Sequence, residues 1–427
     1  MKNLVVVGAG TGGTMVANRM RRRLPADWAL TVVDPDPTHL YQPGLLFLPF
    51  GARDEARMTR PRARTLGPGI AWVRDTVEAL DPDARKLTLA ASGPLAYDLL
   101  VIATGARLRP EETPGLVGPE WRRTIHDFYT LEGAQALRDA LLAFRGGRLV
   151  VNAVEMPIKC PVAPMEFLFL ADAFFTKRGI RDRVEIVYAT PLDGAFTRPT
   201  CNKVLSHLIT SKGIRIETEF GTGEVDADGR VLRSYDDREI PYDLLVTIPT
   251  HGGAPFIEEA GLGNELGFVP TDPATLKAKA RDDIFVIGDA TDLPSSKAGS
   301  VAHFQSEVLE ENLLGAIAGR SLEEGFDGHA NCFIETGFGK ALLVDFNYEV
   351  EPLAGSYPLA GIGPLRLLKE TRLNHLGKLA FRWVYWNALL PGRTLPVSNR
   401  LSMRGKCPVP LTPASESKEG EDTYAAA

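Results

Sequence analysis

The chain contains few cysteines and no excess of positive charge. Only 4 of its 427 residues are cysteine, at positions 160, 201, 332 and 407. They are too few for a scaffold of structural disulfides and too widely spaced for a zinc knuckle, so no metal site is expected. The net charge of −6 argues against nucleic acid as a partner.

Long hydrophobic runs and a secretory signal are also missing. No run of 18 apolar residues occurs in the sequence, so no membrane-spanning helix is expected. Residues 3–8, NLVVVG, already have the pattern of a first core strand, which leaves no room for a signal peptide. In a reducing compartment, any two cysteines that pair are then more typical of a redox-active disulfide than of a structural one.

A nucleotide-binding unit is present at the start of the chain. The strand pattern LVVV leads into GAGTGG, where Gly8, Gly10 and Gly13 fit G-x-G-x-x-G, and a helical pattern follows. These glycines allow a tight turn, a close approach of the pyrophosphate and the packing of helix on strand. A second strand pattern ends at Asp34, where a carboxylate binds a ribose hydroxyl. The unit predicts a dinucleotide site.

Two later segments identify the cofactor. Strand patterns end in Thr104-Gly105 and in Gly288-Asp289. With the glycine turn, they resemble the motifs of the flavoprotein reductases that contain two dinucleotide-binding domains. This resemblance implies an α/β fold with two Rossmann-like domains and FAD as the cofactor, bound in part by these four residues.

The second Rossmann unit lacks its glycines. Its first strand pattern, residues 148–153, is followed by VEMPIKCPVAP, in which three prolines remove backbone donors. The next strand pattern, residues 184–189, ends without an acidic residue for a ribose. We therefore expect residues 111–245 to form a Rossmann-like domain without a functional NAD site.

The segment KCPVAPMEF around Cys160 resembles a signature of the sulfide:quinone oxidoreductases and of the flavin subunit of flavocytochrome c sulfide dehydrogenase. In these proteins the cysteine pairs with a downstream cysteine beside the flavin, and Cys332 is the candidate here. Segments 38–44, 296–307 and 375–387 also resemble the family. The resemblance extends from residue 1 to about residue 400.

The residue types agree with sulfide oxidation. Hydrosulfide is a soft nucleophile, and a disulfide is its natural electrophile. Attack on a Cys160–Cys332 disulfide gives a persulfide and a thiolate beside the flavin. Lys159 is expected to favour the thiolate and Glu166 to move protons.

The C-terminal region predicts contact with a membrane. From Leu365 onward, basic residues alternate with leucine and aromatic residues, including Trp383, Tyr385 and Trp386. This pattern is typical of one or two helices lying on a bilayer, although a cap on the core or a dimer interface is the alternative. The resemblance implies that Lys297 and Lys378 donate to quinone oxygens and that Phe381 stacks on the quinone ring.

The expected domain boundaries follow from these motifs. Residues 1–110 and 246–320 form a discontinuous FAD domain, residues 111–245 the second unit, residues 321–410 the quinone and membrane region, and residues 411–427 a disordered tail. Some family members bind FAD covalently through a cysteine, but the corresponding position here is His126. We therefore expect noncovalent FAD.

The sequence analysis predicts a peripheral membrane sulfide:quinone oxidoreductase on the cytoplasmic side, which assembles as a homo-oligomer. Its substrates are sulfide, which it oxidises to sulfane sulfur or polysulfide, and a membrane quinone, which it reduces. Three alternatives stay open at this point: a flavocytochrome c-type flavin subunit, a type II NADH:quinone oxidoreductase, and a non-catalytic flavin redox sensor.

Overall fold

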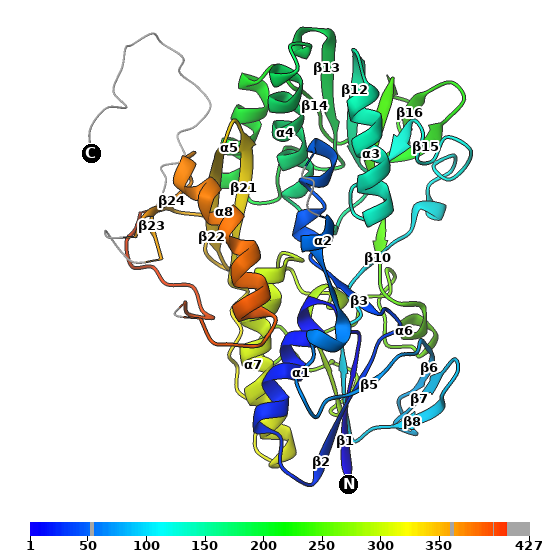
Figure 1. Cartoon of the computed structure of the whole chain (residues 1–427), viewed down its shortest axis with the longest axis vertical. Helices are drawn as coiled ribbons and strands as arrows, with labels where there is room; N and C mark the ends of the chain where they lie inside the picture. Colours follow the sequence, from blue (N-terminus) through cyan, green and yellow to red (C-terminus); the bar gives the residue numbers. More distant parts are fainter. Residues whose placement is uncertain (52–54, 359–362, 396, 408–427) are drawn as a thin grey trace.

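The computed structural model describes residues 1–51, 55–358, 363–395 and 397–407. Two α/β units lie one above the other, and a C-terminal sheet with its helix lies along their side (Figure 1). The fold is α/β with Rossmann-like sheets, as the sequence predicts. The expected disordered tail, residues 411–427, lies outside the described residues.

The first unit is built on a parallel sheet with strand order β20-β9-β1-β2-β5. The strands are β1 (Lys2–Val7), β2 (Trp28–Val33), β5 (Ala71–Val73), β9 (Leu99–Ile102) and β20 (Ile284–Val286). All but the edge strand β5 are almost completely buried, as the near-continuous apolar runs of a parallel sheet predict. Helix α1 (Thr11–Arg23) follows β1 and packs against α7 (Gly299–Ile317). Arg19 joins these two helices by pairing with Glu310 at 2.7 Å.

The second unit has a parallel sheet with strand order β11-β18-β12-β13-β14. Its strands are β11 (Ile125–His126), β12 (Gly147–Ala153), β13 (Val184–Ala189), β14 (Arg215–Glu217) and β18 (Leu244–Ile248). The helices of this unit are α3 (Leu131–Ala143), α4 (Ala163–Lys177) and α5 (Pro199–Ser211). Helix α4 begins three residues after Cys160.

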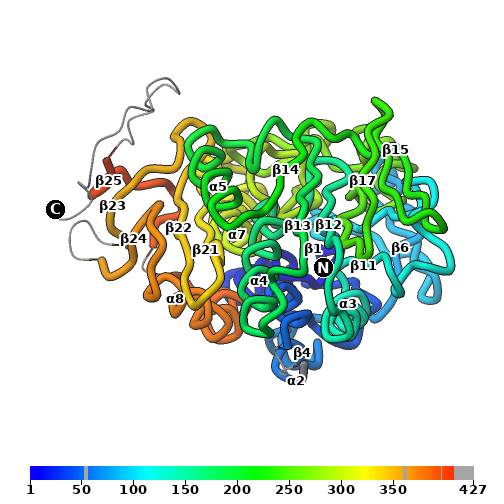
Figure 2. The backbone as a smooth tube through the Cα atoms, turned by 90° about the horizontal axis from the view of Figure 1, so that it is seen from above, coloured from blue at the N-terminus to red at the C-terminus, as the bar shows by residue number. Residues whose placement is uncertain are grey.

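The C-terminal sheet has the order β21-β22-β24-β23-β25. Its strands are β21 (Ala330–Gly337), β22 (Lys340–Phe346), β23 (Ala354–Tyr357), β24 (Leu365–Leu367) and β25 (Lys406–Cys407). Residues 365–367 form a strand where the sequence analysis expected a helix. The helix, α8 (Arg372–Val384), begins later and continues into a π-helical turn, Tyr385–Leu389. Seen from above, this sheet and α8 flank α4 and α5 (Figure 2).

Short elements complete the fold. They are the strands β3 (Thr38–Leu40), β4 (Thr59–Pro61), β6 (Val77–Asp81), β7 (Lys86–Leu89), β8 (Gly93–Ala96), β10 (Arg107–Leu108), β15 (Thr222–Asp226), β16 (Val231–Ser234), β17 (Glu239–Pro241) and β19 (His251–Gly252), and the helices α2 (Glu55–Met58) and α6 (Pro255–Glu259). The pairing of β10 with β19 joins the two chain segments that link the units. Among the described residues, no helix is long and apolar enough to cross a bilayer.

Candidate functional site

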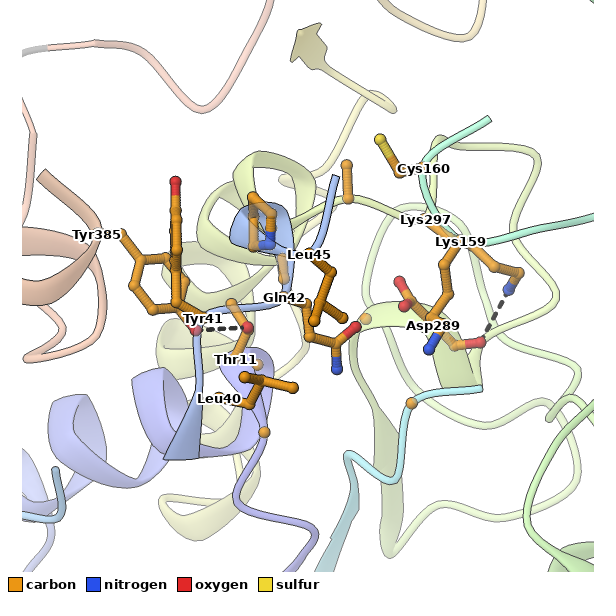
Figure 3. A pocket seen from close by; sticks show the side chains of 18 of the residues that line it. Thr11, Leu40, Tyr41, Gln42, Leu45, Lys159, Cys160, Asp289, Lys297 and Tyr385 are labelled. Carbon is orange, nitrogen blue, oxygen red and sulfur yellow. Dashed lines mark hydrogen bonds between the residues drawn. The ribbon is translucent and has the colours of Figure 1, made fainter. Parts of the chain in front are cut away.

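A cavity of 450 Å³ lies where the two units and the C-terminal region meet, and we call it the central cavity. Its wall contains every residue that the sequence analysis assigns to cofactor, sulfur chemistry or quinone except Gly13: Gly8, Gly10, Asp34, Thr104, Gly105, Lys159, Cys160, Glu166, Gly288, Asp289, Lys297, Cys332, Lys378 and Phe381. Figure 3 shows Cys160, Lys159, Lys297 and Asp289 on one side of this cavity, with Thr11, Tyr41 and Tyr385 on the other.

The glycine turn after β1 forms one end of the cavity. Gly8 has φ +95°, and a Cβ there would lie 2.5 Å from the carbonyl oxygen of Ala103. A Cβ on Gly13 would lie 1.9 Å from the carbonyl oxygen of Gly8, so this glycine serves the packing of helix on strand. Gly10 has open space at its Cβ position. The turn therefore leaves room for a ligand at the N-terminus of α1, where free N–H groups favour phosphate.

Asp34 lies at the end of β2, as predicted, and its carboxylate is already partly engaged. It accepts hydrogen bonds from the backbone N–H of Ala9 at 2.6 Å and of Asp36 at 2.9 Å, and it pairs with Arg62 at 3.0 Å. Burial raises the pKa of Asp34, although Arg62 opposes this effect. The carboxylate thus fixes the glycine turn and still borders the cavity where a ribose would lie.

The remaining cofactor motifs converge on the same cavity. The Thr104 hydroxyl is buried and has no hydrogen-bond partner in the structure. Gly105 and Gly288 both have positive φ and open space at the Cβ position. Burial raises the pKa of Asp289, and Lys297 and Lys159 oppose this rise. An open phosphate cradle, an unpartnered hydroxyl and a buried acid fit FAD.

Cys160 lies in the turn between β12 and α4, and its backbone is strained. Its φ of +48° is unusual for a residue with a side chain. Two backbone hydrogen bonds hold this conformation. The Cys160 N–H donates to the carbonyl oxygen of Lys297 at 2.8 Å, and the Ala163 N–H donates to the carbonyl oxygen of Cys160 at 2.8 Å. The turn thereby places the thiol on the cavity wall.

Cys332 reaches the same wall from β21, which packs against α4. Both thiols are free in the structure. Burial raises the pKa of Cys332 to about 12 and also raises that of Cys160, with Lys378 lowering both. The ammonium of Lys159, which the sequence analysis expects to favour the thiolate, lies 6.0 Å from the centre of the Tyr129 ring. The sequence does not reveal the position of Lys378 near the thiols because Lys378 is 218 positions from Cys160 in the chain.

A buried ionic cluster lies next to the two cysteines. The ammonium of Lys378 donates to the Glu166 carboxylate and, at 2.9 Å, to the carbonyl oxygen of Phe333. The backbone N–H of Glu335 donates to Glu166 at 2.6 Å. Burial alone would lower the pKa of Lys378, but Glu166 and Cys160 outweigh this effect and raise it. Burial raises the pKa of Glu166.

Of the three residues predicted to bind quinone, two lie on α8 and the third lies near Asp289. Lys378 and Phe381 lie on α8 beside Tyr385. Lys297 also lines the cavity, but its ammonium donates to the carbonyl oxygens of Asp289 at 2.8 Å and Thr291 at 2.7 Å. Burial lowers the pKa of Lys297 to about 8. Its position near Asp289 favours a role beside the cofactor over the quinone role.

Several site residues were missed in the sequence analysis. The Tyr385 hydroxyl bonds to Thr11 at 2.8 Å and to His39 at 2.7 Å, which connects α8 to the glycine turn. Glu335 accepts a hydrogen bond from His375 at 2.9 Å on the outer side of the ionic cluster. Tyr385 and His375 belong to the C-terminal segment that was predicted to contact a membrane. Their hydrogen-bond partners are distant in sequence, so no local pattern could identify these two residues as part of the site.

Comparisons with known proteins agree with this geometry. The model of a family described as pyridine nucleotide-disulphide oxidoreductase matches residues 2–306. A mitochondrial sulfide:quinone oxidoreductase of Mus musculus is 26% identical over 396 residues, which cover 91% of this chain and 86% of that protein. The corresponding protein of Dictyostelium discoideum is 25% identical over 396 residues, with the same coverage. The resemblance noted from the sequence is confirmed.

A solved structure shows the same fold. The sulfide:quinone oxidoreductase from the hyperthermophilic bacterium Aquifex aeolicus superposes with a TM-score of 0.75 at 21% identity, and 92% of each chain is covered.

Proposed function

The chain belongs to the pyridine nucleotide-disulphide oxidoreductase family, and from this premise we propose that it is an FAD-dependent sulfide:quinone oxidoreductase. The observation that carries the proposal is the position of Cys160 and Cys332 on the wall of the central cavity. The two cysteines come from a turn of the second unit and a strand of the C-terminal sheet, and the glycine turn borders the same space.

The cysteines carry the sulfur chemistry. In the oxidised enzyme they form a disulfide, and hydrosulfide attacks one sulfur to form a new sulfur–sulfur bond while the old one breaks. One cysteine then holds a persulfide and the other leaves as a thiolate. A second hydrosulfide removes the sulfane sulfur. In the net reaction hydrosulfide loses two electrons and one proton, while the quinone gains two electrons and two protons.

In this reaction Lys378 supplies a positive charge and Glu166 transfers protons. Lys378 is the cation that lowers the pKa of both thiols, so it stabilises the thiolate as it leaves. Glu166 is buried and bonded to Lys378, which allows a proton to pass between them without entry of water. Between this pair and the surface lie two further polar side chains, those of Glu335 and His375, which are hydrogen-bonded to each other.

FAD, when bound, supplies the chemistry that accepts two electrons from sulfur and transfers them to a quinone. Gly10 and the N-terminus of α1 would hold its pyrophosphate, Asp34 would hold its adenosine ribose, and Thr104 and Asp289 would hold its flavin half. We expect noncovalent binding, because His126 replaces a tethering cysteine. Its Nε2 is bonded to the Arg123 carbonyl at 2.9 Å.

The C-terminal region delivers the quinone. Phe381 and Tyr385 border the cavity from α8 and the π-helical turn. On the outer side of α8, Leu373, Leu376, Leu379 and Trp383 are exposed large apolar side chains. We propose that this face lies in the bilayer interface, so that a lipid-soluble quinone enters beside α8. Binding at the cytoplasmic face and a symmetric homo-oligomer are further proposals, supported by the family resemblance alone.

An anaerobic absorbance titration of the purified flavoprotein tests the proposal. Sulfide should bleach the flavin band, a short-chain quinone should restore it, and NADH should do neither. Cys160→Ser and Cys332→Ser should each lower sulfide turnover by at least about 1,000-fold, because neither variant can form the disulfide that hydrosulfide attacks. Cys201→Ser is the matched control and should keep turnover, since Cys201 is buried in α5 and does not line the cavity. Bleaching by NADH but not by sulfide would reject the proposal in favour of an NADH:quinone oxidoreductase.

A further inference from the structure

A second cavity, of 640 Å³, lies beside the C-terminal segment, and we call it the arginine cavity. It shares no lining residue with the central cavity. Its lining residues come from α1, the segment 60–68 and the segment 386–393: Asn18, Arg21, Arg22, Arg60, Arg64, Thr65, Leu66, Gly67, Pro68, Trp386, Leu390, Pro391 and Arg393. Five of them are arginines and none is acidic.

No acidic side chain that the structure describes neutralises the charge of these arginines. Within the described ranges, Arg21, Arg22, Arg60, Arg64 and Arg393 form no ion pair with an aspartate or glutamate. Other arginines of α1 behave differently, because Arg19 pairs with Glu310 and Arg23 with Glu311 on α7. The helix thus directs its paired arginines toward α7 and its unpaired arginines into the cavity.

Several of the guanidinium groups are held in place. Arg21 donates to the carbonyl oxygen of Pro68 at 3.2 Å, and Arg22 donates to that of Pro391 at 2.8 Å. Arg60 stacks over the indole of Trp386, 4.4 Å from the ring centroid. Positioned guanidinium groups bind phosphate through paired hydrogen bonds, and a cluster of like charges favours an anion between them. The cavity therefore has the chemistry of a phosphate site.

The position of the cavity indicates which kind of molecule would supply the phosphate. Trp386 and Leu390 form part of its wall, and Trp383, three residues earlier, ends the exposed apolar face of α8 with 68% of its surface accessible. A lipid whose acyl chains contact this face would bring its headgroup phosphate to the cavity. The whole chain carries a net charge of −6, so a local basic site is needed for attraction to an anionic membrane.

We propose that the arginine cavity binds the phosphate of an anionic phospholipid headgroup. The inference rests on the proposed contact of α8 with the bilayer and adds a lipid preference to it. A bound lipid would orient the enzyme on the membrane with the entrance beside α8 facing the quinone pool.

Vesicle flotation of the full-length holoenzyme tests this inference. Vesicles of phosphatidylcholine alone are compared with vesicles that also contain phosphatidylglycerol, at fixed ionic strength. The wild type should bind the anionic vesicles more tightly, and R60Q/R64Q should reduce this preference by about 25-fold, since each arginine near the surface contributes roughly fivefold. Arg393→Gln, on an exposed loop, is the second variant and should reduce the preference by about fivefold.

The matched control is R145Q/R230Q. It removes two exposed arginines that form no ion pair within the described part of the chain, and both lie in the second unit, away from the cavity. Its lipid preference should equal that of the wild type. An equal loss of lipid preference in this control would show that the effect depends on net charge alone, and it would overturn the inference.

Two further results separate the possible failures. Binding to neutral vesicles without any preference for phosphatidylglycerol would overturn the lipid site and leave the membrane proposal intact, whereas no binding to either vesicle would reject both. Isothermal titration with inorganic phosphate identifies the other source. Phosphate binding that R60Q/R64Q abolishes, in a protein without lipid preference, would make the cavity a site for a soluble phosphate and overturn the inference.

Discussion

At the scale of single residues, the site depends on charges that are buried in pairs. Glu166 is almost inaccessible to solvent, Lys378 is mostly buried, and each is the main partner of the other. A buried ion pair adds little net stability, but the loss of one partner leaves a charge without compensation. Replacing one partner should therefore lower the stability of the protein much more than replacing both partners together.

A double-mutant cycle on this pair tests the coupling. Lys378→Met and Glu166→Gln should each lower the free energy of unfolding by about 3–5 kcal/mol, because each leaves a buried polar or charged partner unpaired. The double variant should lose much less than the sum of the two. Urea denaturation of the four proteins measures this, and additive losses would show that the two side chains are not coupled.

The glycine turn allows a second prediction for single residues. Gly10→Ala adds a methyl group to open space beside the cofactor site, so the protein should fold normally but bind FAD at least about tenfold more weakly. Gly13→Ala instead places a Cβ against the Gly8 carbonyl oxygen, so it should lower the melting temperature. Flavin titration of the apoproteins and thermal melts distinguish the two effects. Normal FAD affinity in Gly10→Ala would contradict the assignment of the pyrophosphate position.

At the scale of elements, helix α8 has two faces of different character. Its inner face carries Lys378 and Phe381 into the central cavity. Gly377 permits this approach, because a Cβ there would lie 2.8 Å from the ring of Phe333. Thr371 caps the helix by accepting the backbone N–H of Asn374 at 3.0 Å. The outer face is left apolar and exposed, which a soluble cap on the core would not require.

The outer face of α8 gives a prediction for membrane binding. Leu376, with 57% of its surface exposed, should tolerate Leu376→Asp without loss of folding, but binding to phosphatidylcholine vesicles should fall by about tenfold or more. The matched control is Leu142→Asp on α3, where a leucine of similar exposure, 50%, lies in the second unit. Equal binding of Leu376→Asp and wild type would show that α8 does not contact the bilayer.

At the scale of the whole molecule, burial of histidines makes stability depend on pH. Burial lowers the pKa of His39 to about 4, of His251 to about 3 and of His303 to about 4. Between these values and the unfolded pKa of about 6.5, the unfolded chain binds more protons than the folded chain. The contribution of these histidines to stability is therefore present above pH 6.5 and is lost as the pH falls toward 4.

This dependence can be measured for one histidine. His39 contacts both Tyr385 and the Ala9 carbonyl oxygen, and it should contribute a loss on the order of 2 kcal/mol in the free energy of unfolding between pH 7 and pH 5. His39→Gln should remove this part of the slope, and replacement of the exposed His207 serves as the control. An unchanged slope in His39→Gln would mean that folding does not lower the pKa of His39.

The sequence by itself determined the motifs whose chemistry is local. The glycine turn, Asp34, the Thr104-Gly105 and Gly288-Asp289 ends of strands and the Cys160 turn each lie within a few residues of the strand that positions them. The α/β fold and the positions of their strands were predictable for the same reason, because apolar runs and turn residues act over short distances. Helix α8 was predicted less well, since the strand at 365–367 forms only by pairing with β22 and β23.

Only the tertiary structure decided which residues meet. It brings Cys332 and Cys160 to one cavity wall, places Lys378 where it lowers the pKa of both thiols, and turns Lys297 toward Asp289. It also gathers five arginines from three separate segments into one cavity. The physical reason is that burial and electrostatic interaction depend on distance in space, and a sequence records only distance along the chain.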